Sequence, residues 1–189
     1  MGSEMCIRDS PTTLDRSSSY AIFKDREARI WVTSMSGVNL YNREEDNFTR
    51  IRDLGSWIMD IDQDADGNIW FSSQGNGLFK YDPDKQEWTN YVHSSAPGAL
   101  INDQVNCVLI DGNGEMWIGT MNGLCKYNAK EDQFELIPLD IPSSNICAII
   151  EDQRVLWLTT TKGLVRYAPE ESCQVFTRSD GLQSEQFLV

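Results

Sequence analysis

A tandem repeat occupies most of this sequence and sets what the chain can fold into. Four tryptophans lie 39, 47 and 40 residues apart, and each is followed at a nearly constant offset by a glycine, an aliphatic residue and a tyrosine. The tryptophans are Trp31, Trp70, Trp117 and Trp157, the glycines are Gly37, Gly77, Gly123 and Gly163, and the tyrosines are Tyr41, Tyr81, Tyr127 and Tyr167. A chain with this period uses one structural unit four times and builds its core between the copies.

Each unit has the pattern of four short strands. In the third copy an apolar run, 105–111, is followed by a turn rich in Gly, Asn and Asp, and then by strands 116–120 and 124–127. A turn and an aromatic residue, Phe134, complete the unit. Four strands in a period of about 40 to 47 residues are typical of a β-propeller blade, so the predicted class is an all-β propeller. We expect the Trp and Tyr rings to fill the layer between blades, and the repeated glycine to supply a positive φ.

The repeat also predicts the domain organisation. We place four blades at about 20–51, 58–91, 105–137 and 146–177, within a propeller segment that covers 20–189. Residues 182–189 align with the start of the third unit, with Leu182 matching Leu100, and predict the start of a next blade. Residues 1–19 match no unit, and we interpret them as a non-native leader and linker, with a genuine short tail as the alternative. We expect an open arc of a larger ring rather than a closed four-bladed one.

Charge and apolar content exclude several classes of protein. Lys and Arg number 16 against 29 Asp and Glu, and a net charge of −13 argues against binding nucleic acid or an anionic membrane surface. The sequence has no apolar run of membrane-spanning length, so we expect no membrane contact by this segment. A single histidine, His93, excludes metal sites built from several histidines.

At these residues the sequence resembles the two-component regulator propeller repeat. The pattern of that family, D-x-x-G-x-[IL]-W-[IL]-G-T-x-x-G-[LI]-x-x-[YF], matches DGNGEMWIGTMNGLCKY at 111–127 closely. The other three copies match with substitutions, such as Ala28 for the turn glycine, or with one residue gained or lost. The resemblance covers about residues 20 to 189.

The resemblance implies a ligand-sensing segment of a two-component regulatory system with no catalysis of its own. Such propellers form the periplasmic, extracytoplasmic part of membrane-anchored histidine kinases, many of which respond to glycan fragments. The implied partners are an oligosaccharide, the rest of the sensor kinase chain, and a second copy of the parent protein. The alternatives are a protein-interaction or scaffold propeller without a small ligand, and a propeller lyase or hydrolase.

Propeller geometry predicts where a ligand would bind. The turns between second and third strands and the loops between blades emerge on one face, where sites in propellers generally gather. The residues on these loops that could engage a sugar are Trp57, Asn76, Asn102, Asp103, Asn122 and Lys162. The alternative is that they are ordinary polar loop residues.

Other candidate chemistry has a simpler interpretation. The segment 62–67 begins like a calcium loop but has Ser73 where the bidentate Glu should stand, so we expect a hairpin turn, with weak cation binding as the alternative. His93 with Asp103 and a neighbouring serine could form a hydrolytic set, but no nucleophile motif is present and we expect a solvated loop histidine. We predict no cofactor and no metal. The five cysteines form no C-x-x-C pair, and we expect buried thiols, with a disulfide between blades as the alternative.

Overall fold

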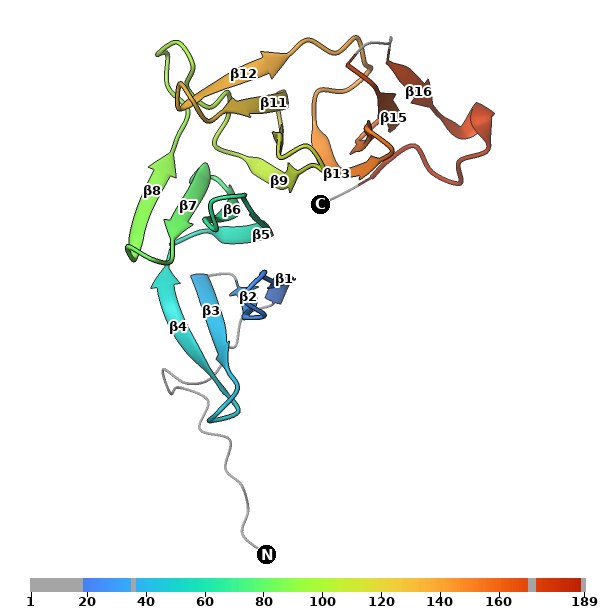
Figure 1. The fold of residues 1–189 in the computed structure, drawn as a ribbon. Coiled ribbons are helices and arrows are strands. Elements are labelled where there is room, and N and C mark those ends of the chain that lie inside the picture. Colours follow the sequence, from blue (N-terminus) through green and yellow to red (C-terminus); the bar gives the residue numbers. More distant parts are fainter. Residues whose placement is uncertain (1–18, 35–36, 170–172, 188–189) are drawn as a thin grey trace, which may run out of the picture. The chain divides into compact units, whose positions relative to one another are not determined.

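The computed structural model describes residues 19–34, 37–169 and 173–187. Residues 1–18 of the predicted leader and linker (1–19) lie outside this part of the chain, and Ser19 is the first residue of β1. The described residues form four four-stranded antiparallel sheets, in each of which the strands follow one another in chain order (Figure 1). The chain divides into two compact units, residues 1–58 and 59–189. The all-β class and the four-stranded blades predicted from the repeat are confirmed. No helix in the described residues is long and apolar enough to cross a membrane.

The first unit contains one sheet. Its strands are β1 (Ser19–Lys24), β2 (Ile30–Ser34), β3 (Gly37–Asn42) and β4 (Asn47–Asp53). Trp31 of β2 pairs with Leu40 of β3, and its side chain is buried. Ala28, in the turn before β2, adopts a positive φ of 62°. Since a Cβ disfavours this conformation, the turn stores strain that a glycine would relieve.

The second unit contains three sheets, the first of which begins at the end of the first unit. The second sheet comprises β5 (Trp57–Gln63), β6 (Ile69–Gln74), β7 (Leu78–Asp82) and β8 (Glu87–Tyr91). The third comprises β9 (Val105–Ile110), β10 (Met116–Thr120), β11 (Gly123–Asn128) and β12 (Gln133–Ile137). The fourth comprises β13 (Ile146–Asp152), β14 (Val155–Thr160), β15 (Gly163–Tyr167) and β16 (Gln174–Phe176), followed by a 3₁₀ turn, η1 (Arg178–Asp180).

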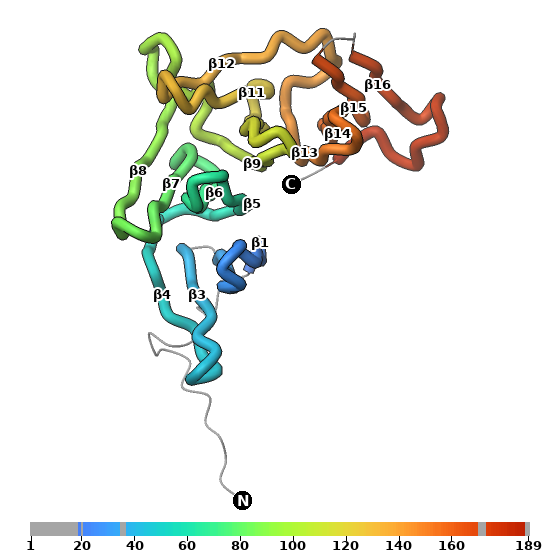
Figure 2. Tube along the Cα trace, viewed as in Figure 1, coloured from blue at the N-terminus to red at the C-terminus, as the bar shows by residue number. Residues whose placement is uncertain are grey.

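Within the second unit the first strand of each sheet is the inner one. Strands β9 and β13 pack against each other, and β8, β12 and β16 lie at the outside (Figure 2). Residues 182–187, predicted to start a further blade, form no strand in the described part of the chain.

The repeated aspartate fixes the repeated tryptophan, a role that the sequence analysis did not assign. In the first three sheets the indole N–H donates to the aspartate six residues earlier. The bonds join Trp31 to Asp25 (2.7 Å), Trp70 to Asp64 (2.7 Å) and Trp117 to Asp111 (2.9 Å). The same carboxylates accept backbone N–H groups of their turns, so one side chain closes the hairpin and satisfies a largely buried donor.

The fourth sheet lacks this arrangement. Its first turn is a two-residue turn of Gln153 and Arg154, with φ values of 52° and 68°, and Asp152 lies only five residues before Trp157. No bond from the Trp157 indole to this aspartate is present among the described residues, and the ring is half-buried. Trp157 instead packs against Phe176 of its own sheet, with ring centroids 5.6 Å apart.

The repeated glycine supplies the predicted positive φ, from 76° to 138°, in the three sheets of the second unit. A Cβ on Gly37 would lie 2.1 Å from the carbonyl oxygen of Arg52, and a Cβ on Gly77 would lie 2.1 Å from that of Tyr91. At these two positions glycine is required because the fourth strand of the sheet passes too close for any side chain.

The repeated Trp and Tyr rings pack against each other between neighbouring sheets of the second unit, as predicted, although they do not fill both layers completely. Trp70 meets Tyr127 of the next sheet edge to face at 5.1 Å, and Trp117 meets Tyr167 in the same way at 6.1 Å. Cys107, Cys125 and Cys147 are buried and free, which confirms the expected buried thiols. Cys173 is free and partly exposed, and Cys6 lies outside the described residues.

Two backbone N–H groups on the inner edge of β9 donate hydrogen bonds to carboxylates of the preceding sheet. Asp60 Oδ2 accepts the backbone N–H of Val108 (3.1 Å), and Asp62 Oδ2 accepts that of Ile110 (2.6 Å). The two-residue spacing on β5 matches the two-residue spacing of free donors on β9. Burial raises the pKa of Asp60 to about 6, although the N–H of Val108 opposes the shift.

Candidate functional site

The predicted ligand face is built by the turns between second and third strands. In each sheet of the second unit a hydroxyl before the turn donates to the carbonyl oxygen of the turn glycine. The bonds join Ser73 to Gly77 (2.8 Å), Thr120 to Gly123 (2.9 Å) and Thr160 to Gly163 (2.9 Å). These turns are therefore rigid supports rather than open loops.

A hydrogen-bonded clamp fixes the long loop from His93 to Asp103. The carboxylate of Asp103 accepts the backbone N–H of His93 (2.6 Å), which joins the two ends of the loop. The backbone carbonyl of Asp103 accepts the N–H groups of Gly75 and Gly77 (both 3.0 Å), which joins the loop to the preceding sheet. Asp103 thus holds the loop at both ends with one side chain and one carbonyl group.

The same clamp recurs after the fourth sheet. The carboxylate of Glu185 accepts the N–H of Arg178 (3.0 Å), and its carbonyl accepts the N–H of Gly163 (2.7 Å). Glu185 is related to Asp103 by the offset of 82 residues that relates Leu182 to Leu100. The predicted alignment of the chain end with the entrance to the third unit is therefore matched by equivalent hydrogen bonds.

Five of the six predicted ligand residues lie along one run of hydrogen bonds. Asn76 sits between the two glycines that donate to Asp103, and Asn102 accepts the N–H of Gln104 (2.7 Å). The Gln104 carbonyl accepts the N–H of Met121 (3.1 Å), beside Asn122. This part of the face joins the turn of the second sheet to the turn of the third.

The run continues to the fourth sheet through the next loop. Ser144 Oγ donates to the carbonyl of Met121 (3.4 Å), and the hydroxyls of Ser143 and Thr161 lie 2.7 Å apart, beside Lys162. The side chains of Asn122 and Lys162 are exposed. Trp57, which is 44% exposed, begins β5 and lies in the first unit, whereas the other five predicted residues lie in the second.

The alternative hydrolytic set is not assembled by this loop. The Asp103 carboxylate bonds the backbone N–H of His93, whereas the His93 ring contacts the carbonyl oxygen of Leu100 through Nδ1 (2.9 Å). The imidazole is therefore oriented by the loop backbone and not by a carboxylate, unlike the base of a Ser-His-Asp triad.

The calcium-like segment 62–67 forms a hairpin turn. Both oxygens of Asp64 accept N–H groups, from the backbone of Asp66 and Asn68 and from the indole of Trp70. Asp62 accepts the N–H of Ile110. In the described part of the chain no group of three or more His, Cys, Asp and Glu side chains is placed to hold a metal ion.

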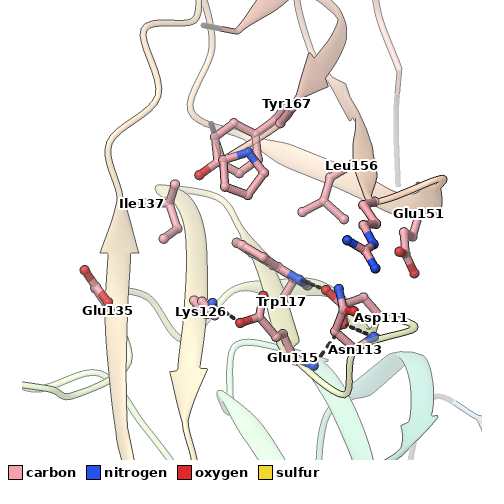
Figure 3. A pocket seen from close by; sticks show the side chains of 13 residues that line it. Asp111, Asn113, Glu115, Trp117, Lys126, Glu135, Ile137, Glu151, Leu156 and Tyr167 are labelled. Carbon is pink, nitrogen blue, oxygen red and sulfur yellow. Dashed lines mark hydrogen bonds and ion pairs between the residues drawn. The ribbon is translucent and has the colours of Figure 1, made fainter. Parts of the chain in front are cut away.

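A cavity of about 600 Å³ lies between the third and fourth sheets, and the sequence analysis missed it. It opens where the first and second strands of these sheets are joined, at the opposite end of the strands from the predicted ligand face. Trp117, Lys126 and Glu135 line it from the third sheet, and Leu156 and Tyr167 from the fourth (Figure 3). Arg154, in the turn between β13 and β14, also lines it.

Charged groups surround the aromatic floor of this cavity. Lys126 forms an ion pair with Glu115 (2.5 Å) and lies over the Trp117 ring, 5.2 Å from its centroid. Glu151 of the fourth sheet accepts the N–H of Gly112 in the third (2.6 Å), so the two sheets are tied together at the rim. Burial raises the pKa of Tyr167, and the neighbouring carboxylate of Glu115 acts in the same direction.

Residues 99–122 match the family described as two component regulator propeller. This chain contains a two-component regulator propeller repeat. The matched segment runs from the end of the clamped loop through β9 and β10 to the turn at Asn122. No curated protein matches the sequence.

Solved structures share the propeller fold. The extracellular domain assigned to a hybrid two-component system of Bacteroides thetaiotaomicron has a TM-score of 0.77 at 18% identity, over 88% of this chain and 25% of that one. A second such domain from this organism has a TM-score of 0.59 at 21% identity, over 94% of this chain and 29% of that domain. Virginiamycin B lyase of Staphylococcus aureus has a TM-score of 0.69 at 17% identity, over 87% of this chain and 57% of the lyase.

The propeller fold is thus shared between this chain and longer domains. The chain spans about a quarter of the length of the first of these sensor domains and just over half of the lyase. At these identities the likeness shows the fold alone, so it assigns neither a ligand nor a reaction.

Proposed function

We propose that this propeller segment is part of the ligand-sensing, extracytoplasmic domain of a two-component regulatory system. The observation that carries the proposal is the match of residues 99–122 to the regulator propeller repeat, within a fold shared with extracellular domains of such systems. Binding would change the packing of the propeller against the rest of the sensor kinase chain or a second copy, and so bias a two-state kinase.

The ligand that suits the loop face is a neutral oligosaccharide. Amide and ammonium groups of Asn76, Asn122 and Lys162 can exchange hydrogen bonds with sugar hydroxyls, and their turns are held rigid by the bonds described above. The net charge of −13 opposes sulfated or uronate-rich chains, which would be repelled over distances near the Debye length.

Titration calorimetry with matched variants tests the proposal. The chain is titrated with a panel of neutral and sulfated oligosaccharides, and we expect heat only from neutral ones. Asn122→Ala combined with Lys162→Ala should weaken binding at least tenfold, because both side chains are exposed and can contact a ligand on the loop face. Asn90→Ala, an exposed amide in the middle of β8, is the control and should leave affinity unchanged. If no neutral oligosaccharide binds, the scaffold alternative replaces direct sensing by this segment.

A further inference from the structure

The two interfaces between the sheets of the second unit are built from the same repeat but are filled differently. At the end of β8, Tyr91 pairs with Leu78, and at the end of β12, Ile137 pairs with Leu124. Because Leu78 and Leu124 each follow the repeated glycine, Tyr91 and Ile137 occupy equivalent positions. Any difference between the two interfaces at this position therefore comes from the side chain.

Tyr91 fills the first interface with an aromatic ring. Its ring is stacked on Trp70, with centroids 5.6 Å apart and planes at 18°, and it also meets Tyr127 of the next sheet at 6.0 Å. Its hydroxyl donates to Asp132 (2.7 Å) and lies 3.4 Å from the hydroxyl of Tyr127. The repeat thus contains a place for one phenol ring beside a tryptophan and a tyrosine that contact each other.

At the second interface that place is open. Ile137 has no ring to stack on Trp117, and it lines the 600 Å³ cavity together with Trp117 and Tyr167 (Figure 3). Lys126 lies over Trp117 just as Lys80 lies over Trp70, at 5.2 and 5.3 Å from the ring centroids. Since Tyr91 stacks on Trp70 with Lys80 in position, the lysine leaves room for a ring.

The charges around the cavity select the substituent that such a ring would carry. The lining holds four carboxylates, Asp111, Glu115, Glu135 and Glu151, and two cations, Lys126 and Arg154. Lys126 is paired with Glu115, so an excess of negative charge faces the cavity. A protonated amine is favoured at this rim and a carboxylate is opposed.

We propose that the cavity between the third and fourth sheets binds a small phenol that carries a protonated amine. The ring lies against Trp117 as Tyr91 lies against Trp70, and its hydroxyl bonds the hydroxyl of Tyr167 as that of Tyr91 meets Tyr127. The amine faces the carboxylates at the rim. A volume of about 600 Å³ is within the range of small-molecule sites. This site is separate from the loop face of the proposed sensor function, so either can fail without the other.

Nuclear magnetic resonance on the 189-residue chain tests the proposal, with a variant needed only to assign one signal. The probes are tyramine, p-cresol and 4-hydroxyphenylacetate, which share the phenol and carry positive, no and negative charge. The chain has six tryptophans, and the Trp117 indole N–H signal, assigned with Trp117→Phe, should shift saturably while the other five stay in place. Tyramine should bind at least tenfold more tightly than 4-hydroxyphenylacetate. A Trp117 signal unmoved by 10 mM tyramine, or equal affinity for all three probes, would overturn the proposal.

A pair of matched substitutions locates the ring. Ile137→Tyr supplies the chain's own phenol and should raise the dissociation constant for tyramine at least tenfold. Leu136→Tyr adds the same ring one residue earlier, at a side chain that is 52% exposed and does not line this cavity, and should change affinity less than twofold. Folding of both variants is checked by circular dichroism. Unchanged binding in folded Ile137→Tyr places the ligand elsewhere and refutes the site.

Discussion

The interface between the second and third sheets is filled by rings, whereas that between the third and fourth sheets contains a cavity. Tyr91 contacts Trp70, Tyr127 and Phe134 at the first, while Ile137 stands in its position at the second. The repeat therefore specifies the tryptophan and tyrosine of each interface but leaves the end of the outer strand variable. One side chain at that position decides whether an interface is closed or can accept a ligand.

The largest effect is expected from opening the filled interface. Tyr91→Ile removes the stacked ring and leaves the Asp132 carboxylate with one hydroxyl donor fewer, which we expect to destabilise the chain by about 3–4 kcal/mol. Urea unfolding followed by circular dichroism measures the change. Tyr91→Phe, which keeps the ring, should lose only about 1 kcal/mol, and equal losses would show that the ring itself contributes little.

Substitution of the turn aspartates tests whether water in the cavity can replace a carboxylate as the hydrogen-bond acceptor of a tryptophan indole N–H. Asp64→Ala should cost about 2–3 kcal/mol, because the Trp70 indole N–H is then buried without an acceptor. Asp111→Ala should cost about 1 kcal/mol less, since Asp111 and Trp117 line the cavity and water can reach the freed donor. The two variants are compared by urea unfolding under identical conditions. A larger loss at Asp111 would contradict the difference between the interfaces.

Asp60 gives the filled interface a dependence on pH. Burial raises the pKa of this carboxyl from 3.8 to about 6, so the folded chain binds the proton more tightly than the unfolded chain does. The stabilisation from that proton is complete below about pH 4 and is lost as the pH rises through about 6. We expect a loss of about 1–3 kcal/mol, reduced from the full shift because the group is only partly buried.

Asp60→Asn removes this titration and keeps an acceptor for the N–H of Val108. Its stability should exceed that of the unsubstituted chain at pH 7.5 and match it more closely at pH 4, as measured by urea unfolding at each pH. The third sheet has Cys107 at the equivalent position, so the open interface contains no such carboxylate. Asp84→Asn, in an exposed turn, is the charge-matched control. If the difference in unfolding free energy between Asp60→Asn and the unsubstituted chain is the same at both pH values, Asp60 is not the cause of the pH dependence.

The smallest effect is expected from closing the open interface. Ile137→Tyr should stabilise the chain by about 1 kcal/mol, since the new ring can stack on Trp117. Thermal unfolding against Leu136→Tyr, which adds the same ring at an exposed position, isolates the contribution of the cavity. A lower melting temperature for Ile137→Tyr would show that its ring does not fit where Tyr91 fits.

The fold could be predicted from the sequence because its determinants recur. Trp117, Gly123 and Tyr127 have counterparts in every unit, and four coincident patterns specify strands and turns that one copy would leave ambiguous. The steric requirement for glycine at position 37 could not be predicted, because the approach of the Arg52 carbonyl oxygen depends on how the fourth strand lies against the third.

The candidate site was less predictable because it depends on differences between copies. The loop face followed from propeller geometry, but the Asp103 clamp depends on a loop folding back to Gly77, and no local pattern encodes that approach. The sequence contains one sign of the cavity, which is that Ile137 stands where the preceding unit has Tyr91. That signal has meaning only once the register of β11 and β12 shows the two positions to be equivalent.

The clamp has a consequence for how such a protein can change. Asp103 closes a loop that starts at His93, and Glu185 closes a shorter one that starts at Arg178, so the same anchor tolerates different lengths between its ends. Doubling the length of a flexible loop costs only about 0.6 kcal/mol once its ends are fixed. The exposed segment 94–97, which precedes the contact of Gly98 with Phe134 of β12, is therefore a point where new sequence can be inserted and new recognition acquired while the blades stay unaltered.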